Sequence, residues 1–293
     1  MPTLTAAAAA DLFRAAPDRF LDVGEGEAAY RRVGSGPDVL FVHGWPVSGA
    51  TWRTLLPYLA DHVTCHVIDL PGTGSSRFGP GTRLTIDQHI VSVRRALDRL
   101  ELHDVAVVGH DSGGMIARHA VVGDRRLRAL GLVDTEQSHG LSWRFRLFLA
   151  GRNLPGFGAT LAWVSGKRRL RRNQFVLGGA FVDKGLLDGE FDEFFLAPLR
   201  EQPERLDAAV RLLRSFDTRL VTELGAVHRR LDVPVRLVWG ARDPFFPLAW
   251  AEEMVATFPD ADLEVVPGAA LFSHEERPAE VAASLLPVLT GTR

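Results

Sequence analysis

The sequence contains a single cysteine, Cys65, among its 293 residues. An intramolecular disulfide is therefore impossible, and because Cys65 lies in an apolar run at 63–68, we expect a buried free thiol in a cytoplasmic protein. No stretch reaches the roughly 20 apolar residues that a membrane-spanning helix needs. The alanine run at 6–10 has neither a basic leader nor a long apolar core, so we expect no signal peptide.

A strong net charge is also absent. The formal net charge is −2, which gives no electrostatic reason to expect nucleic acid or an anionic membrane surface as a partner. The dense basic run at 167–172 is interpreted as a solvated helix face rather than a guide for an anionic substrate. The glycine-rich segment 69–76 lacks the spacing and the lysine of a P-loop, and we expect no cofactor and no metal. A small apolar organic substrate remains as the expected partner of a monomer or homodimer.

Hydrophobic residues make up 46% of the chain, which is enough for one large core. Strand signals alternate with helical signals, as is typical of a mostly parallel sheet covered by helices on both faces. The predicted strands lie at 20–23, 28–33, 39–42, 63–68, 105–108, 130–133, 235–239 and 263–266. The predicted helices, with apolar residues three or four apart, lie at 51–59, 86–100, 112–122, 249–257 and 278–289.

Residues 135–227 interrupt this alternation with helical signals and no strand. We therefore predict an α/β core formed by 1–134 and 228–293, with a helical cap of 135–227 inserted into it. Aromatic side chains are frequent in the insert, Trp143 and Trp163 among them. They either line an apolar substrate pocket or pack the cap against the core.

The sequence around Asp111 predicts a nucleophile. An apolar strand at 105–108 runs into Gly109-His110-Asp111-Ser112-Gly113-Gly114 and then into a helix, a pattern that holds the central side chain on a strained corner. A carboxylate at such a corner attacks saturated carbon, displaces halide or opens an epoxide, and forms an alkyl ester that water must cleave. The alternative is a loop in which Asp111 caps the following helix.

These motifs resemble the α/β-hydrolase superfamily, and within it the epoxide hydrolases and haloalkane dehalogenases that use an aspartate nucleophile. The segment Phe41-Val42-His43-Gly44-Trp45-Pro46 has the His-Gly-x-Pro form of that group. The resemblance implies an eight-stranded, mostly parallel sheet with an inserted helical cap. It also implies an oxyanion hole made by the backbone N–H groups of Trp45 and Ser112, with His43 holding the loop beside the substrate pocket.

The histidine that serves as catalytic base in this group is missing. The segment from Gly268 to Pro278 resembles the family's C-terminal motif, and Leu271 stands at the position of the base. His274 matches a second histidine that is not the family's base. It is either a substitute base or a capping and packing residue.

Two aspartates compete as the acid that would orient such a histidine. Asp243 follows the strand at 235–239 in the form Gly-x-x-Asp-Pro, the more specific match to epoxide hydrolases and some dehalogenases. Asp134 follows the strand at 130–133, the place that other dehalogenases use. We prefer Asp243 and keep Asp134 as the alternate acid, and with Leu271 in the base position either aspartate can have become structural.

Markers of individual substrates are also missing. The group's epoxide hydrolases protonate the epoxide oxygen with two cap tyrosines, but the only tyrosines here, Tyr30 and Tyr58, precede the elbow. We therefore expect carbon–halogen bonds and activated epoxides, whose leaving groups need less protonation, to react in preference to simple epoxides.

The sequence also lacks the usual halide-binding residue, because Ser112 follows the nucleophile where dehalogenases commonly have tryptophan. The indole N–H of Trp45, Trp143 or Trp163 would have to replace it. We predict a hydrolase of epoxides or carbon–halogen compounds that acts through an alkyl-enzyme ester, with turnover impaired by the missing histidine. A non-hydrolytic tailoring or ligand-binding member of the fold is the alternative.

Overall fold

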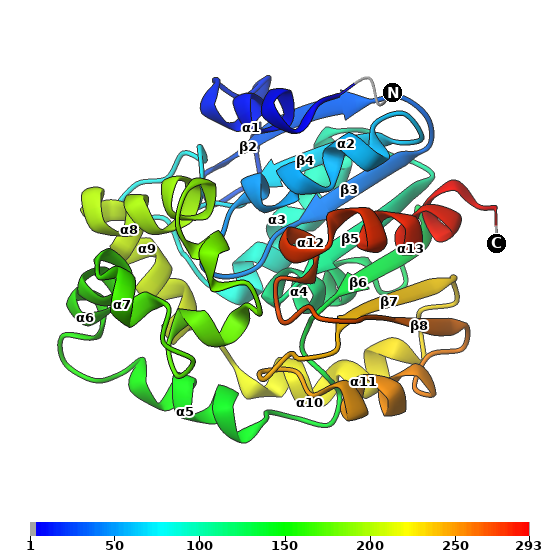
Figure 1. Ribbon diagram of the computed structural model, residues 1–293. Coiled ribbons are helices and arrows are strands. Elements are labelled where there is room, and N and C mark those ends of the chain that lie inside the picture. Colours follow the sequence, from blue (N-terminus) through cyan, green and yellow to red (C-terminus); the bar gives the residue numbers. More distant parts are fainter. Residues whose placement is uncertain (1–3, 293) are drawn as a thin grey trace.

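A twisted eight-stranded sheet forms the centre of the computed structural model, which describes residues 4–292 (Figure 1). The order of strands across the sheet is β1-β2-β4-β3-β5-β6-β7-β8. β2 pairs antiparallel with β1 and β4, and all other pairs are parallel. The strands are β1 (Arg19–Asp22), β2 (Glu27–Gly34), β3 (Asp38–Val42), β4 (Thr64–Asp69), β5 (Val105–His110), β6 (Leu127–Val133), β7 (Val235–Gly240) and β8 (Ala261–Val266). The predicted mostly parallel eight-stranded sheet is confirmed.

The central strands are apolar because neither face of the sheet meets water. Every residue of β4 and β5 is buried, and β3 is buried from Val39 onward. Such strands lose the alternation of polar and apolar residues that a half-exposed strand shows. β1 lies at the edge of the sheet and exposes Arg19 and Asp22.

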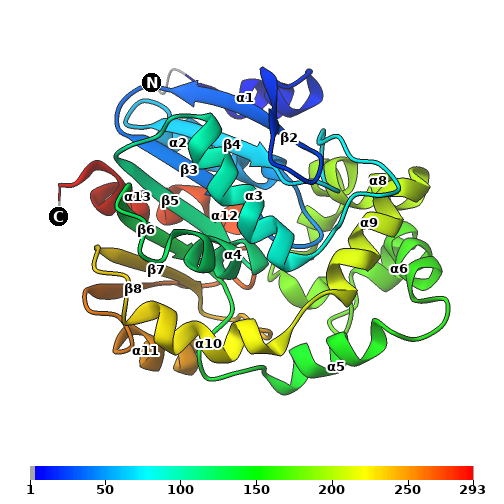
Figure 2. The same cartoon turned by 180° about the vertical axis from the view of Figure 1, so that it is seen from behind.

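Helices cover both faces of the sheet (Figure 2). One face carries α3 (Ile86–Arg99), α4 (Ser112–Val121), α10 (Thr218–His228) and α11 (Leu248–Val255). The other carries α2 (Leu56–Leu59), α12 (Ser273–Glu276) and α13 (Pro278–Thr290). α1 (Ala6–Arg14) packs against the 3-10 helix η1 (Gly49–Thr54). The helix predicted at 51–59 is divided into η1 and α2, because Pro57 has no N–H to donate and is tolerated only in the first turn of a helix.

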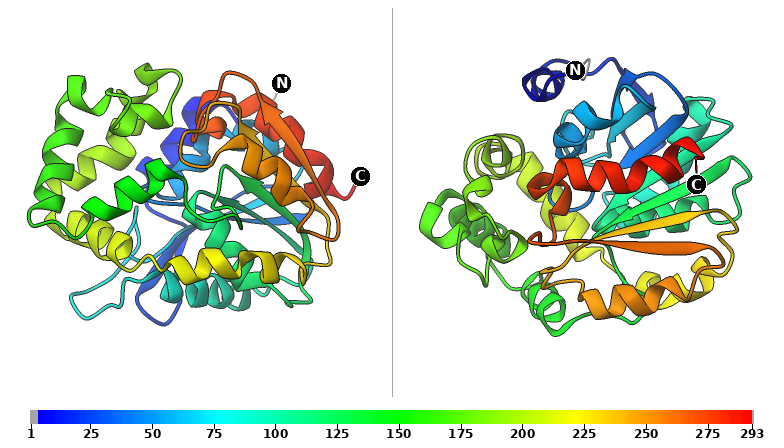
Figure 3. Two further views of the ribbon diagram at one scale, coloured as in Figure 1. Left: turned by 90° about the horizontal axis from the view of Figure 1, so that it is seen from below. Right: turned by 45° about the vertical axis from the view of Figure 1, so that its right-hand side comes forward.

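The cap is a helical insertion between β6 and β7, beside one end of the sheet (Figure 3). It contains α5 (Trp143–Gly151), α6 (Phe157–Gly166), α7 (Arg168–Arg171), η2 (Leu177–Ala180), η3 (Lys184–Leu187), η4 (Asp192–Leu196), α8 (Ala197–Glu201) and α9 (Pro203–Arg214). α10, which the predicted boundary at 227 assigns to the cap, packs against α4 of the core. No helix within residues 4–292 is long and apolar enough to cross a membrane.

Candidate active site

The loops that follow β3, β5, β6 and β7 meet under the cap, at the carboxyl ends of parallel strands, where ligand sites of α/β sheets form. Asp111 stands at the corner between β5 and α4 with φ 51° and ψ −136°, a strained backbone for a residue other than glycine. Its N–H donates to the Asp134 carbonyl oxygen at 3.0 Å. A Cβ at Gly113 would overlap the backbone of the loop after β3, so this close crossing requires glycine. The predicted elbow geometry is present.

A backbone N–H group and a hydroxyl hold the Asp111 carboxylate. Oδ2 accepts from the Trp45 N–H at 2.8 Å and from the Ser112 hydroxyl at 3.3 Å. Burial raises the pKa of Asp111 to about 6, and the backbone N–H groups of Ser112 and Trp45 oppose that rise in its pKa. Gly44 lets the Trp45 loop approach, because a Cβ there would lie 2.5 Å from Oδ2. The two donors can therefore stabilise negative charge that develops on this oxygen.

A cavity of about 400 Å³ opens above Asp111 and is lined mainly by apolar side chains of the cap and the core. Leu271 and Phe272 form part of its wall, so the residue predicted to stand at the position of the family's base faces the cavity. The ionisable side chains that line it, among the described residues, are Asp111, Glu136 and Arg144.

The two candidate acids differ in what their oxygens bind. Asp134 accepts from the Gly240 N–H at 2.6 Å with Oδ1 and from the Ser273 hydroxyl with Oδ2. Asp243 accepts from the N–H groups of Phe245 and Phe246 with Oδ1 alone, while its buried Oδ2 has no partner among residues 4–292. Burial raises the pKa of Asp243 to about 8. Asp243 therefore retains a free acceptor, whereas both oxygens of Asp134 are engaged.

His274 does not line the cavity. It is fully buried, and its Nε2 lies 2.7 Å from the Thr51 hydroxyl oxygen. Its ring packs against Trp52 and His110. Burial lowers the pKa of His274 well below its ordinary value, so the imidazole is neutral. This placement supports the packing role over that of a substitute base.

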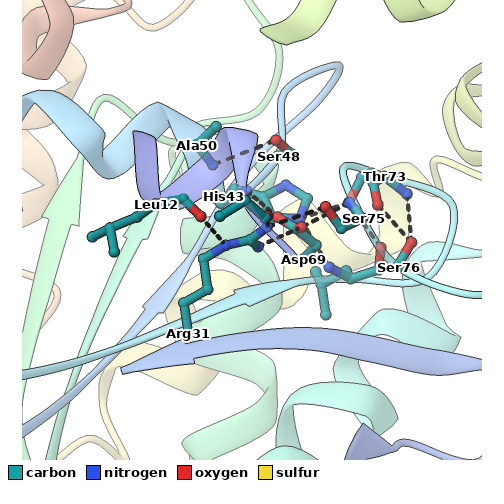
Figure 4. Close-up of polar contacts among 12 residues, drawn as sticks. Leu12, Arg31, His43, Ser48, Ala50, Asp69, Thr73, Ser75 and Ser76 are labelled. Carbon is teal, nitrogen blue, oxygen red and sulfur yellow. Dashed lines mark hydrogen bonds and ion pairs between the residues drawn. The ribbon is translucent and has the colours of Figure 1, made fainter. Parts of the chain in front are cut away.

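His43 also lies outside the cavity that contains Asp111, which corrects its expected place at the substrate pocket. It joins the polar network around Arg31 and Asp69 (Figure 4). Its Nε2 accepts from the Leu70 N–H at 3.1 Å and lies 3.0 Å from the Thr73 hydroxyl oxygen. The ring therefore holds the loops after β3 and β4 together and is engaged in that structural task.

The sequence profile of the alpha/beta hydrolase family matches residues 39–284. The chain belongs to the alpha/beta hydrolase family. The pimeloyl-(acyl-carrier protein) methyl ester esterase of Chromobacterium violaceum is 28% identical over 83% of this chain and 92% of its own length. Haloalkane dehalogenase 2 of Mycobacterium tuberculosis is 25% identical over 92% of this chain and 93% of its own.

Solved structures agree in fold. An epoxide hydrolase superimposes with a TM-score of 0.77 at 22% identity, covering 94% of this chain and 99% of that chain. A reconstructed ancestral haloalkane dehalogenase gives a TM-score of 0.76 at 22% identity, covering 93% and 99%. At this identity the likeness concerns the fold alone.

The three tryptophans considered as indole donors occupy different environments in this protein. The Trp45 indole N–H donates to the Ala209 carbonyl oxygen at 2.8 Å and is not available to a halide. Trp143 lines the outer part of the cavity and is 66% exposed. Trp163 does not line the cavity and is 58% exposed, so its expected place in the pocket is also corrected.

Glu136 is the pocket residue that sequence reasoning missed. Burial, together with the charge of Asp111, raises its pKa to about 8. The loop after β6 carries it, two positions beyond Asp134, and no motif marks that position. The sequence offers one indication of its role, a carboxylate in the segment that follows a central strand. Carboxylates are too common in such segments for this to identify a site residue.

Replacing Glu136 by glutamine should change how stability depends on pH. Folding raises the pKa of the Glu136 carboxyl from 4.5 to about 8, so between these values the folded protein holds a proton that the unfolded chain has lost. The contribution of Glu136 to the free energy of unfolding is therefore full below pH 4.5 and is lost as the pH rises toward 8. Glutamine has no such loss. The unfolding free energy of Glu136→Gln relative to wild type should therefore increase across this window, by at most about 1.4 kcal/mol per pH unit. Urea titrations at pH 5, 6, 7 and 8 test this, and a constant difference would contradict it.

Proposed function

We propose that this protein is a hydrolase in which the Asp111 carboxylate attacks saturated carbon and breaks a carbon–halogen bond or an epoxide carbon–oxygen bond. The product of that step is an alkyl ester on Asp111. The observation that carries the proposal is the position of the carboxylate, on a strained corner between the Trp45 and Ser112 donors, at the base of a mainly apolar cavity.

Ester cleavage would use the same geometry. Water attacks Cγ of Asp111, and the charge that forms on Oδ2 is stabilised by the donors already bonded to it. The weak point is the activation of that water, because Leu271 occupies the wall where the family's histidine would stand. Loss of a general base lowers a hydrolysis rate roughly 10²- to 10⁴-fold. We therefore infer that ester cleavage, and not its formation, limits the turnover of haloalkanes.

The relatives support this choice of chemistry within the family. A haloalkane dehalogenase aligns with nearly the whole chain, and an epoxide hydrolase shares the fold. The similar methyl ester esterase shows that the family also contains relatives that cleave carboxylic esters. An aspartate at the elbow favours attack on saturated carbon in this chain.

Intact-mass measurement after incubation with haloalkanes and epoxides tests the proposal. We expect a mass increase that peptide mapping assigns to Asp111. The increase should equal the alkyl group less one hydrogen for a haloalkane and the whole epoxide for an epoxide, and the haloalkane adduct should be lost slowly. If no substrate of either class labels the protein while apolar ligands bind tightly in the cavity, the chain is a ligand-binding member of its family and the proposal fails.

A further inference from the structure

The cavity contains one acidic group that the steps above do not use. Tyrosine does not line it: Tyr30 lies in β2 with its hydroxyl 2.8 Å from His66, and Tyr58 lies in α2. The acids predicted from the sequence, Asp134 and Asp243, do not line it either. Glu136 remains, in the wall of the same cavity as Asp111.

Contacts on one side fix the Glu136 carboxyl in place. Its Oε2 accepts from the Thr135 hydroxyl at 3.1 Å, and that hydroxyl also lies 2.7 Å from the Asp111 carbonyl oxygen. The buried Arg118 donates to the backbone carbonyl of Glu136 at 2.7 Å. These bonds tie the loop after β6 to the elbow that carries Asp111.

The other carboxyl oxygen of Glu136 is not engaged. Oε1 is buried and has no hydrogen-bond partner among the described residues, and the side chain as a whole is only 1% exposed. A buried polar atom without a partner is rare unless a ligand or water satisfies it. In a cavity that is otherwise mainly apolar, Oε1 is the atom able to exchange a proton with a bound substrate.

We propose that Glu136 is the catalytic acid that protonates the leaving oxygen when Asp111 opens an epoxide. The inference rests on the proposed function of Asp111. In this step Oδ1 of Asp111 forms a bond to the epoxide carbon, the carbon–oxygen bond breaks, and the released oxygen takes the proton of Glu136. The products are a hydroxyalkyl ester on Asp111 and a Glu136 carboxylate.

The carboxylate formed in this way then serves as base for the second step. It accepts a proton from water, and the water oxygen attacks Cγ of Asp111. The hydrogen bonds from Trp45 and Ser112 stabilise the negative charge that forms on Oδ2. Collapse breaks the bond between Cγ and the alkyl oxygen, and the released alkoxide takes the proton left on Asp111. Epoxide and water have become a diol, and Asp111 is again ionised and Glu136 protonated.

The electrostatics suit this sequence of proton transfers. Burial gives Asp111 a pKa of about 6 and Glu136 a pKa of about 8, so at neutral pH the nucleophile is ionised while the acid keeps its proton. The negative charge of Asp111 is one cause of the raised Glu136 pKa. Alkylation removes that charge, while burial, the larger cause, continues to hold the Glu136 pKa above its ordinary value.

Halides should behave differently, because a halide ion leaves without a proton. Alkylation by a haloalkane needs no acid and leaves Glu136 protonated at neutral pH, unable to activate water. The Asp111 ester should then accumulate with haloalkanes and be cleared with epoxides. This revises the preference against simple epoxides that the missing cap tyrosines suggested.

The test compares 1,2-epoxyhexane with 1-bromohexane on wild type, Glu136→Gln and the control Glu275→Gln. Quenched-flow intact mass at pH 7 measures how fast Asp111 is alkylated. Glutamine keeps an acceptor for Thr135 but is a poor acid, so Glu136→Gln should slow epoxide alkylation roughly 100-fold and change bromohexane alkylation less than about threefold. Glu275→Gln should preserve this ratio of the two rates, since Glu275 is buried beside Arg53 and does not line the cavity.

A pH profile of the unmodified protein gives a second measurement that does not depend on a variant folding. Epoxide alkylation should fall above pH 8, as Glu136 ionises, while bromohexane alkylation should not. Equal losses with both probes in Glu136→Gln, or an epoxide rate that stays flat above pH 8, would overturn the role of Glu136 and leave that of Asp111 standing. Failure of both probes to label wild-type Asp111 would instead overturn the proposed function.

Discussion

Replacing Asp111 by asparagine or alanine is expected to remove alkylation of the protein by any substrate. Neither an amide nor a methyl group can attack carbon, and loss of a covalent nucleophile lowers rates by at least about 10³-fold. Intact mass with haloalkane and epoxide probes measures the adduct, and product release measures turnover.

Stability distinguishes these two variants. Asparagine keeps the shape of the side chain, an acceptor for the Trp45 N–H, and a tolerance for the positive φ of the elbow. Alanine keeps none of these, and Asp111→Ala should lower the free energy of unfolding by about 1 to 2 kcal/mol more than Asp111→Asn does. A thermal melt of Asp111→Asn close to wild type would show that lost labelling reflects lost chemistry. Full labelling of that folded variant would place the nucleophile elsewhere.

Replacing Leu271 by histidine should raise turnover at least tenfold, near the lower bound for a restored general base. Leu271 lines the cavity, so an imidazole there faces the ester on Asp111. The buried Oδ2 of Asp243 has no partner among residues 4–292 and is free to orient the new ring. The gain should be seen as faster decay of a bromohexane adduct, because that ester lacks any other ionised base at pH 7.

Two controls separate a new base from a change in shape. Leu271→Gln adds a polar side chain without a base and should give no gain, and Asp243→Asn combined with Leu271→His should lose most of it. His274→Ala should leave the decay of the adduct within about threefold of wild type, since His274 faces Thr51 behind the cavity wall. Abolished turnover in a folded His274→Ala protein would contradict our assignment of the base position.

The core could be predicted from the sequence because its strands are continuous apolar runs. The elbow could be predicted because glycine is required at the positions where its backbone passes close to other segments. The cap could not be divided into helices in the same way. Its short segments, such as the π-helical turn at Asp192–Leu196, are stabilised by contacts with distant parts of the chain and carry weak local signals.

Glu136 illustrates the larger gap. Its place beside Asp111 depends on β5 and β6 being neighbours in register, with His110 opposite Val133, and on Arg118 holding the loop that follows β6. Residue spacing in the sequence shows neither which strands pair nor which carbonyl a buried arginine outside any motif binds. His43 shows the reverse case, since its motif was recognised but its side chain serves the polar network of another cavity.

Trp45 belongs both to the chemistry and to the cap. Its backbone N–H meets Asp111, its indole N–H donates to Ala209 in α9, and its ring packs against Phe148 of α5 at 5.4 Å between centroids. A displacement of α9 relative to the loop after β3 would break the indole bond or carry the Trp45 loop with it. Trp45 thus couples the position of α9 to the oxyanion donor, and a change in α9 that never touches substrate would be felt in the rate of ester hydrolysis.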